Sequence, residues 1–600
     1  MFPTAPTAKA KHMKIRASIA VLALIGVALA IGQSLRPAPM DSYIVQGVSV
    51  ANVKALVVDH GGEITHELGV IRAVAAKLTA GQVADLREHE NVRRIYDNGA
   101  IETAAKGGKK STPSDGTTSD GTTSDGTTDD STLTATDTFY TTLVNGDAVH
   151  QMGIDGTGIG IAVLDTGLWK TSGIRYDSAG GERIKAVYNA MTDQVAASPL
   201  SGDDPAGHGS HVASIAVSSL MTADGTARYN GVAPGAHLVS VQAFDQNGQG
   251  TYADVIRAID WIVANKSKHK IRILNASFSA EARSHYWDDP INQAIMVAWQ
   301  NEIFVVAAAG NRGPAPMTIG VPGNVPYVMT VGAMTDNFTP SDPSDDKLAS
   351  FSSAGPTYEG FMKPEIVAPG GHMRGLVQNN ATLATAYPEY YDGDYFEMSG
   401  TSQATAVVSG IAALVLQAEP WRSVDQLKCK IVSAAKPATV TTGKGGNKET
   451  TLAYTVFQQG AGMVDAYAAV MNQTIDCANH GLHIDNDIDG TQHFGGRANQ
   501  DANGDYFLMG LDGYMWTNGY QWTDGTLWTE GYQWTDGYMW TDGYQWTDGT
   551  VGIEGYMWTG GDGLSTDGYQ WTDGGLTTNG YMWTGGLTEM ATMSSWVEPE

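Results

Sequence analysis

Cysteine is almost absent from this sequence of 600 residues, which contains only Cys429 and Cys477. So small a number excludes a scaffold held together by many disulfides and a zinc cluster built on cysteines. The two side chains are either buried thiols or a single disulfide that closes the end of the main domain. A stable disulfide requires that the protein be exported.

Basic residues are scarce as well. The sequence has 36 Lys and Arg against 64 Asp and Glu, a net charge of −28. Nucleic acid is therefore not expected as a partner, because a phosphate backbone is bound by clustered Lys and Arg. The deficit is uneven, since residues 482–600 contain 18 acidic residues and one arginine and carry −17 of this charge. Ten of the 15 Trp lie between Trp516 and Trp596, so a globular protein is followed by a tail of different composition.

An apolar, uncharged run near the N-terminus, residues 17–32, indicates export. Four basic residues precede it, and Ala28-Leu29-Ala30 supplies small residues for cleavage. We therefore expect residues 1–30 to be a signal peptide of a secreted or cell-envelope protein. The run is short for a membrane span, and an uncleaved anchor is the alternative.

The rest of the chain divides by composition. Residues 42–103 indicate a small mixed α/β unit, whereas residues 104–136 repeat SDGTT and are typical of a flexible linker. Over residues 140–472, short apolar runs such as GIGIAVLD alternate with helical stretches such as YADVIRAIDWIVANK. This alternation predicts an α/β fold with a mostly parallel sheet, whose chemistry lies at the carboxyl ends of the strands.

Three polar residues stand where these predicted elements begin or end. Asp165 closes the strand in GIAVLDTGL, His208 opens a helix in GHGSHVASIAV, and Ser402 opens another in SGTSQATAVV. Serine needs a base to take its proton, and the base needs a carboxylate to fix its tautomer. An acid, an imidazole and a hydroxyl in these places predict nucleophilic acyl transfer.

Each motif alone has another interpretation. Asp-Thr-Gly also occurs in aspartic proteases, HGSH is a weak candidate for a metal-binding pair, and Gly-Thr-Ser before a helix is an ordinary cap. The combination is more specific than any single motif.

The contexts DTG, HGSHVA and GTSQAT, in this order, resemble the three signatures of the subtilisin-like serine peptidases (subtilases). GVAPGAHL, ILNASFS, AAAGNRG and KPEIVAPG are also similar to family segments, so the resemblance covers most of residues 140–472. It implies a subtilisin-like three-layer fold and an endopeptidase that hydrolyses protein or peptide substrates through an acyl-enzyme, with no cofactor for catalysis.

The resemblance also assigns binding residues. It implies that Asn311 is the side-chain donor of the oxyanion hole, and that Gly320 lies at the base of the pocket for the residue before the scissile bond. A glycine there favours a bulky apolar residue in the substrate. The two segments between which a peptide would lie are Gly248-Gln249-Gly250 and Ser277-Phe278-Ser279.

Two positions depart from the family pattern, which has Met after the catalytic serine and Pro at the end of that motif. Here these positions hold Gln403 and Ala406. Because Gln forms no sulfoxide, we expect better tolerance of peroxide than in relatives with Met, and Gln403→Met is expected to remove that advantage.

Residues 42–103 resemble the subtilase pro-peptide, which implies a zymogen whose own pro-peptide is an intramolecular inhibitor. The linker after it offers a site for self-cleavage between about Gly99 and Asp137.

The acidic segment 473–512 contains a possible calcium loop. Asp485, Asp487 and Asp489 have the spacing of calcium ligands, although position twelve of the loop is Gly496 rather than Glu. Structural calcium and an acidic, solvated linker are the two interpretations.

Residues 513–600 repeat units such as GYQWTD, with Trp six residues apart from Trp516 to Trp546. The repeat indicates either a disordered tail or a stack of short strands with an aromatic face for a glycan or the cell envelope. A surface adhesin whose peptidase domain serves maturation is the alternative to the endopeptidase.

Overall fold

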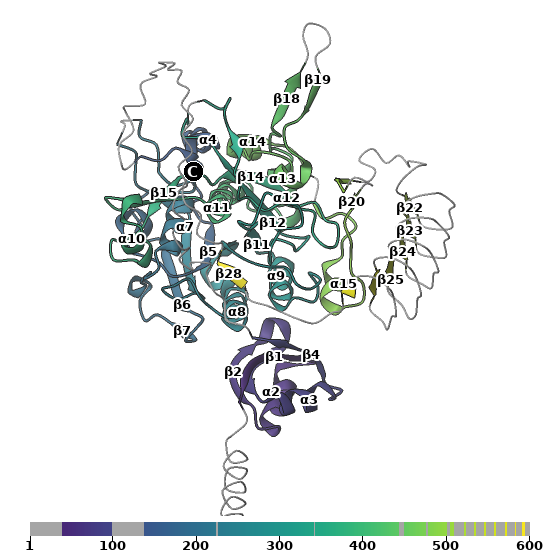
Figure 1. Ribbon diagram of the computed structural model, residues 1–600. Coiled ribbons are helices and arrows are strands. Elements are labelled where there is room, and N and C mark those ends of the chain that lie inside the picture. The colour runs from purple at the N-terminus through teal and green to yellow at the C-terminus, as the bar shows by residue number, and fades with distance from the viewer. Residues whose placement is uncertain are drawn as a thin grey trace, which may run out of the picture.

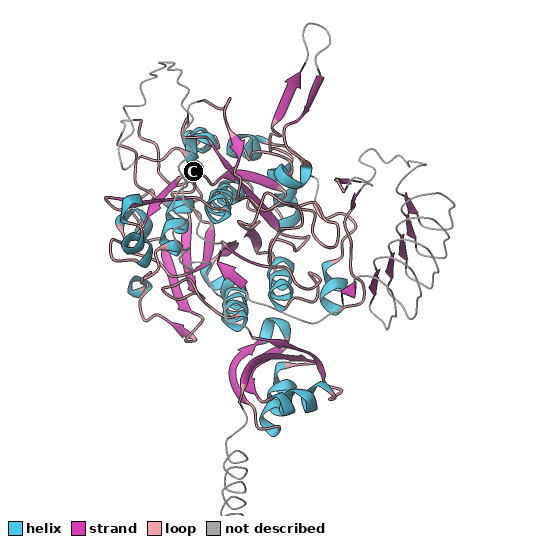
Figure 2. Ribbon diagram, in the orientation of Figure 1, coloured by secondary structure: helices cyan, strands magenta, loops and turns pink. Residues whose placement is uncertain are grey.

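The computed structural model describes residues 39–98, 137–223, 226–340, 342–442, 449–475, 478–500 and 504–508, together with seven short strands between residues 521 and 593. They form a small N-terminal unit, a large α/β domain and a stack of short strands (Figures 1 and 2). The predicted signal peptide and the SDGTT linker lie outside the described residues.

The N-terminal unit is a four-stranded antiparallel sheet in the order β2-β3-β1-β4 with helices on one face. Strand side chains alternate between the two faces. Val45 and Val74 pack with helix residues such as Val53, whereas Ile44 and Ala75 join the core of the large domain. The elements are β1 (Asp41–Gly47), α2 (Val50–Asp59), β2 (Glu63–Leu68), η1 (Gly69–Ile71), β3 (Ala73–Leu78), α3 (Ala80–Arg87) and β4 (Val92–Asp97).

The large domain is built on a nine-stranded sheet in the order β13-β12-β11-β9-β5-β8-β6-β7, with β14 added beside β12. Its central pairs are parallel and the short strands β7 and β13 at its ends are antiparallel. All six residues of β5 are buried, as expected for a strand covered on both faces. The strands are β5 (Gly160–Asp165), β6 (Ile184–Asn189), β7 (Gln194–Val195), β8 (His237–Gln242), β9 (Ile271–Ala276), β11 (Phe304–Ala308), β12 (Met329–Thr335), β13 (Lys347–Leu348) and β14 (Ile366–Pro369).

Two pairs of helices cover this sheet, which confirms the predicted three-layer α/β fold (Figure 2). On one face α7 (His208–Val217) packs against α11 (Thr401–Ala418), and on the other α8 (Tyr252–His269) packs against α9 (Pro290–Gln300). Among the described residues, α11 alone is long and apolar enough to cross a membrane, but most of it is buried inside the domain, as in a core helix.

Shorter elements complete the domain around this frame. The helices are α4 (Tyr140–Leu143), α5 (Gly146–Gln151), α6 (Ser172–Arg175), α10 (Thr382–Ala386), α12 (Val424–Val432), α13 (Val456–Gln459) and α14 (Ala466–Met471), with the 3₁₀ turns η2 (Pro199–Ser201) and η3 (Pro388–Tyr390). The strands are β10 (Phe278–Ala280), β15 (Met373–Leu376), β16 (Tyr391–Asp392), β17 (Tyr395–Met398), β18 (Thr439–Thr442) and β19 (Glu449–Leu452).

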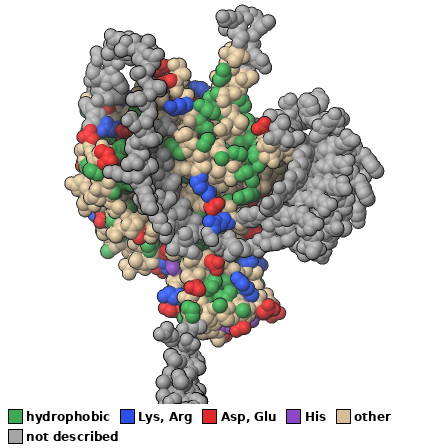
Figure 3. Space-filling view, in the orientation of Figure 1, with side chains coloured by type: hydrophobic (Ala, Val, Ile, Leu, Met, Phe, Trp, Pro, Cys, Tyr) green, Lys and Arg blue, Asp and Glu red, His purple; other side chains and the backbone are tan. Residues whose placement is uncertain are grey.

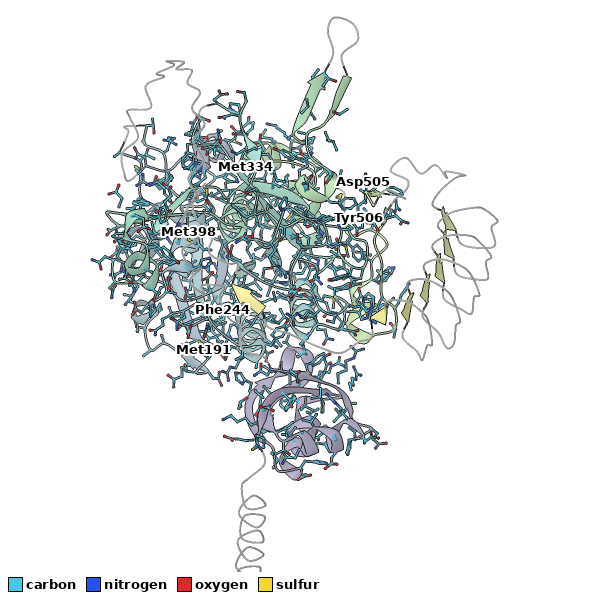
Figure 4. All side chains as sticks on the ribbon, in the orientation of Figure 1. Met191, Phe244, Met334, Met398, Asp505 and Tyr506 are labelled. Carbon is cyan, nitrogen blue, oxygen red and sulfur yellow. The ribbon has the colours of Figure 1, made fainter. Side chains whose placement is uncertain are left out.

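The acidic segment after the domain is folded onto it rather than being a solvated linker. It forms α15 (Ile484–Asp489), β20 (Ala498–Gln500) and β21 (Tyr506–Leu508). Tyr506, labelled in Figure 4, lies edge-on to Phe457 with ring centroids 6.3 Å apart. The space-filling view shows basic and acidic side chains interspersed over the visible described surface (Figure 3).

The repeat tail contributes six strands in one parallel sheet (Figure 1). Each strand pairs in register with the next repeat, so that Trp522 lies opposite Trp534 and Trp534 opposite Trp546. Each strand of the stack, here called a rung, therefore recurs after two of the six-residue units recognised in the sequence. The strands are β22 (Gln521–Thr523), β23 (Gln533–Thr535), β24 (Gln545–Thr547), β25 (Met557–Thr559), β26 (Gln570–Thr572) and β27 (Met582–Trp583).

Candidate active site

Asp165 and His208 meet at the carboxyl end of the central strand. Asp165 is the last residue of β5 and His208 the first of α7, and the Asp165 Oδ1 lies 2.7 Å from the His208 Nδ1. Both side chains are buried. A carboxylate only accepts hydrogen bonds here, so Nδ1 carries the proton and Nε2 is the basic nitrogen. This pair contradicts the aspartic-protease interpretation of Asp165.

The charge on Asp165 sets the basicity of His208. Burial alone lowers the pKa of His208, but the negative charge of Asp165 and its hydrogen bond outweigh burial and raise that pKa above its ordinary value. The buried Nε2 makes no hydrogen bond with any described residue. It is thus placed to accept a proton from a reacting group.

Ser402 is the second residue of α11, close to the positive end of the helix dipole. Its hydroxyl donates to the carbonyl oxygen of Ser277 at 3.1 Å, and the Ser277 hydroxyl donates to the carbonyl oxygen of Ser402 at 3.0 Å. These reciprocal bonds fix the start of α11 against the chain that leads into β10. Because catalytic hydrogen bonds commonly form only with substrate bound, a turn of the Ser402 side chain from Ser277 toward His208 is the expected rearrangement.

Asn311 is oriented by Thr401, the residue before Ser402. The backbone N–H and the hydroxyl of Thr401 donate to the Asn311 Oδ1 at 3.0 and 2.9 Å. Because its oxygen accepts these two bonds, the Asn311 amide is fixed with Nδ2 as the outward donor. The arrangement is the one expected of an oxyanion-hole donor beside the Ser402 backbone.

The predicted substrate segments border this site. Phe278 of β10 packs on Phe244, which is labelled in Figure 4, and the ring centroids are 5.6 Å apart. This contact anchors the strand in the core. Gly320 lies against the same strand, because a Cβ there would come within 2.0 Å of the Ser279 Oγ and 2.4 Å of the Ala280 carbonyl oxygen. Residues 248–250 lie in the turn between β8 and α8, where Gly248 has a φ of +70°.

Sequence reasoning missed Asp204, which joins the ends of β5 and α7. Its carboxylate accepts from the hydroxyls of Thr166 and Ser210, each at 2.7 Å, and from the backbone N–H groups of Ser210 and Gly207 at 2.7 and 3.0 Å. Burial raises the pKa of Asp204 even though these four bonds oppose it. Its position four residues before His208, ahead of Gly207, was the only available signal.

The second histidine of HGSH has a structural role. The Nε2 of His211 lies 3.2 and 3.0 Å from the carbonyl oxygens of Met373 and Phe396, so it carries the proton. Gln403, the residue after the nucleophile, places its Nε2 3.4 Å from the other ring nitrogen. Burial lowers the pKa of His211 to about 3, so the ring is neutral. Because its Nε2 proton faces two carbonyl oxygens and its other ring nitrogen faces Gln403, the His211 ring is not directed toward a metal shared with His208, contrary to the metal-pair interpretation.

The structure does not assemble the predicted calcium ligands. Asp485, Asp487 and Asp489 lie in α15 rather than in a loop, and residues two apart in a helix face different sides. Asp487 instead accepts from the hydroxyls of Tyr286 and Tyr327 at 2.8 and 2.6 Å. Within the described ranges, no group of three or more acidic, His or Cys side chains could hold a metal ion.

The disulfide stays a prediction. Cys429 lies in α12, whereas Cys477 is outside the described residues. The neighbouring Ala478 donates to the carbonyl oxygen of Asp425, one turn before Cys429. Ala478 therefore lies beside α12.

Comparison with known proteins agrees with this geometry. Residues 156–462 match the subtilase family. The serine protease AprX of Bacillus subtilis is 37% identical over 281 residues, which are 46% of this chain and 60% of that protein. Subtilisin DY of Bacillus licheniformis is 29% identical over 299 residues, 49% of this chain and 89% of that protein.

Among solved structures, that of fervidolysin from Fervidobacterium pennivorans, a keratinolytic enzyme related to subtilisin, has a TM-score of 0.51 at 20% identity. The match covers 73% of this chain and 62% of fervidolysin, and it shows a common fold. The family match takes in more than half of the chain and includes Asp165, His208 and Ser402. The chain therefore belongs to the subtilase family.

Proposed function

We propose that this protein is an exported serine endopeptidase made as a zymogen. The observation that carries the proposal is the buried Asp165–His208 pair, with an Nδ1–Oδ1 distance of 2.7 Å and the His208 Nε2 left as the basic atom. A neutral imidazole with a basic Nε2 is what a serine nucleophile requires. Family membership and the position of Ser402 at the start of α11 support the same chemistry.

The proposed reaction uses four groups of this chain. His208 takes the proton of Ser402 as its oxygen attacks the peptide carbonyl, and Asp165 stabilises the imidazolium that results. Asn311 Nδ2 and the Ser402 backbone N–H donate to the oxyanion. His208 then passes its proton to the leaving amine, and water hydrolyses the acyl-enzyme by the same steps.

Substrates are proposed to be extended peptides that add a strand beside β10. Recognition by main-chain hydrogen bonds tolerates many sequences, so the specificity is broad. Gly320 packs directly on Ser279 and Ala280 of β10. The preference proposed for the residue before the scissile bond, Phe, Tyr, Leu or Met, rests on the resemblance to the family.

The N-terminal unit is proposed to act as the pro-peptide and intramolecular inhibitor. The face of its sheet that is not covered by α2 and α3 packs on α8 and α9, and polar contacts border that interface. The Gln46 amide donates to Gln293 at 2.7 Å, and the backbone N–H of Gly69 donates to Asp260 at 3.0 Å. The last described residue of the unit, Asn98, accepts from the Ala253 N–H at 3.0 Å, near the Gly248–Gly250 segment.

Mass spectrometry of the secreted wild type beside Ser402→Ala tests the proposal. We expect the wild type to lose the N-terminal unit, hydrolyse casein and react with a serine-directed fluorophosphonate, whereas Ser402→Ala keeps the unit and does neither. Trimming of pure Ser402→Ala, or failure of the trimmed wild type to hydrolyse casein, would refute it.

The tail is proposed to attach the secreted enzyme to a glycan or to the cell envelope. The in-register stack of β22–β27 supports this, because it places a Trp on every strand at a fixed spacing. Deletion of residues 510–590 is expected to release the enzyme from cells with caseinolysis intact. Attachment that is kept after this deletion would contradict the proposed role of the tail.

A further inference from the structure

A short strand near the end of the chain pairs with β10, the strand that follows Ser277. β28 (Ala591–Met593) pairs antiparallel with β10, with Ala591 opposite Ala280, Thr592 opposite Ser279 and Met593 opposite Phe278. The six other tail strands pair only with one another. Figure 1 shows β28 at the large domain, away from the stack of β22–β25.

The backbone of β10 identifies which of its edges β28 occupies. The N–H and the carbonyl oxygen of Ala280 both bond to Val321, at 2.8 Å each. Successive residues of a strand direct these groups to opposite edges, so those of Ser279 face β28. Ser279 and Thr592 are therefore the pair that exchanges main-chain hydrogen bonds.

The nucleophile lies at the end of the same segment. The Ser277 carbonyl oxygen, two residues before Ser279, accepts the Ser402 hydroxyl at 3.1 Å. β28 runs from Ala591, opposite Ala280, to Met593, opposite Phe278, and so runs toward Ser277 and Ser402. An external peptide adding to this edge of β10 would need the place that β28 occupies.

We propose that the C-terminal segment Ala591–Met593 is an intramolecular ligand of the substrate cleft, bound as an added strand in competition with peptide substrates. This inference rests on the proposed endopeptidase function. The residue after Met593 is Ser594, unlike the bulky apolar residue proposed before the scissile bond, so the segment binds as an occupant rather than as a good substrate. The tail then lowers activity on dilute peptides and leaves it unchanged when substrate is abundant.

Kinetics on a short peptide substrate test the competition. The variants are the full chain, a chain ending at Met590, Thr592→Pro, and Thr592→Ala as the matched control that keeps the main-chain N–H. A tethered segment at an effective concentration of about 1 mM and a Kd of about 0.1 mM raises KM about tenfold. We expect the truncation and Thr592→Pro to lower KM by about that factor with kcat unchanged, and Thr592→Ala to match the full chain.

Equal KM values in all four active proteins, each with the expected intact mass, would overturn the inference and leave the endopeptidase proposal standing. Inactivity of all four would count against the endopeptidase proposal instead. The second measurement needs no activity: hydrogen exchange at Ser279 in the Ser402→Ala background. We expect exchange there about tenfold slower in the full chain than with Thr592→Pro, and equal rates would overturn the inference.

Discussion

At the residue scale, the active site depends on how each side chain is held by its neighbour. Asp165 fixes His208, Thr401 fixes Asn311, and Ser277 holds Ser402. The first two bonds leave the His208 Nε2 and the Asn311 Nδ2 directed away from the anchoring group, whereas the Ser402 Oγ itself donates to Ser277. The bonds that hold His208 and Asn311 each lead to a prediction.

We expect His208 to set the acid limb of the pH profile. Since the base must be neutral and Asp165 raises its pKa, kcat/KM on an uncharged peptide is expected to rise with pH through a midpoint above the ordinary histidine value of about 6.5. Asp165→Asn removes the charge that stabilises the imidazolium, so the midpoint should move to lower pH while turnover falls about 10⁴-fold. A midpoint that stays in place in Asp165→Asn would show that another group titrates.

Asn311→Ala removes one donor to the oxyanion. We expect kcat to fall by about 10²–10³ with little change in KM, a magnitude carried over from a subtilisin. Asn311→Asp keeps the acceptor for Thr401 but places a negative charge beside the oxyanion, so its kcat is expected to be lower still. A higher KM with an unchanged kcat would instead show that Asn311 contributes to binding of the substrate rather than of the transition state.

At the element scale, the ends of β5 and α7 are joined by Asp204. Its four accepted bonds connect the residue after Asp165 with the first turn of α7, which begins at His208. The Asp165–His208 pair is thus supported by a third buried side chain.

Asp204→Ala leaves the buried hydroxyl of Thr166 and N–H of Ser210 without this acceptor. We expect it to lower the free energy of unfolding by about 2–4 kcal/mol, in the range for a broken buried hydrogen-bond network. Denaturant titration in the Ser402→Ala background, which prevents self-digestion, measures the change. The exposed neighbour Asp203 is the matched control, and an equally large loss in Asp203→Ala would contradict the interpretation.

The sequence was sufficient for the catalytic elements because their constraints are local. A buried strand that ends in Asp165 and helices that start at His208 and Thr401 are encoded by runs of neighbouring residues. Asp204 was missed because its role depends on contacts between two separate elements. The calcium loop was expected from spacing alone, yet Asp487 bonds to Tyr286 and Tyr327, which lie far away in the chain.

At the scale of the whole molecule, both ends of the chain bear on the catalytic domain. The N-terminal unit packs on α8 and α9, and β28 pairs with β10. The first contact agrees with the pro-peptide role implied by resemblance to the family. The second could not be predicted, because a three-residue segment in a repeat tail carries no signal of its partner strand.

The N-terminal unit should leave earlier when its polar contacts to α9 are removed. Gln293 binds Gln46, and Asp288, just before α9, forms an ion pair with Arg94. We expect the double variant Gln293→Ala, Asp288→Ala to shorten the lag before caseinolysis appears, because the inhibitor dissociates more readily. Lys268→Ala, on the exposed end of α8, should keep the wild-type lag, and an unchanged lag in the double variant would contradict the proposal.

The register of the tail strands also ties the length of the stack to the number of repeats. Rungs repeat every twelve residues, and the thirteenth residue between β25 and β26 is absorbed without loss of pairing. Adding or deleting one twelve-residue block therefore moves every later rung by one place, about 4.8 Å along the stack, and leaves all other partners equivalent. The number of blocks can change through recombination between similar repeats, so the reach of the tail can evolve without any change in the enzyme.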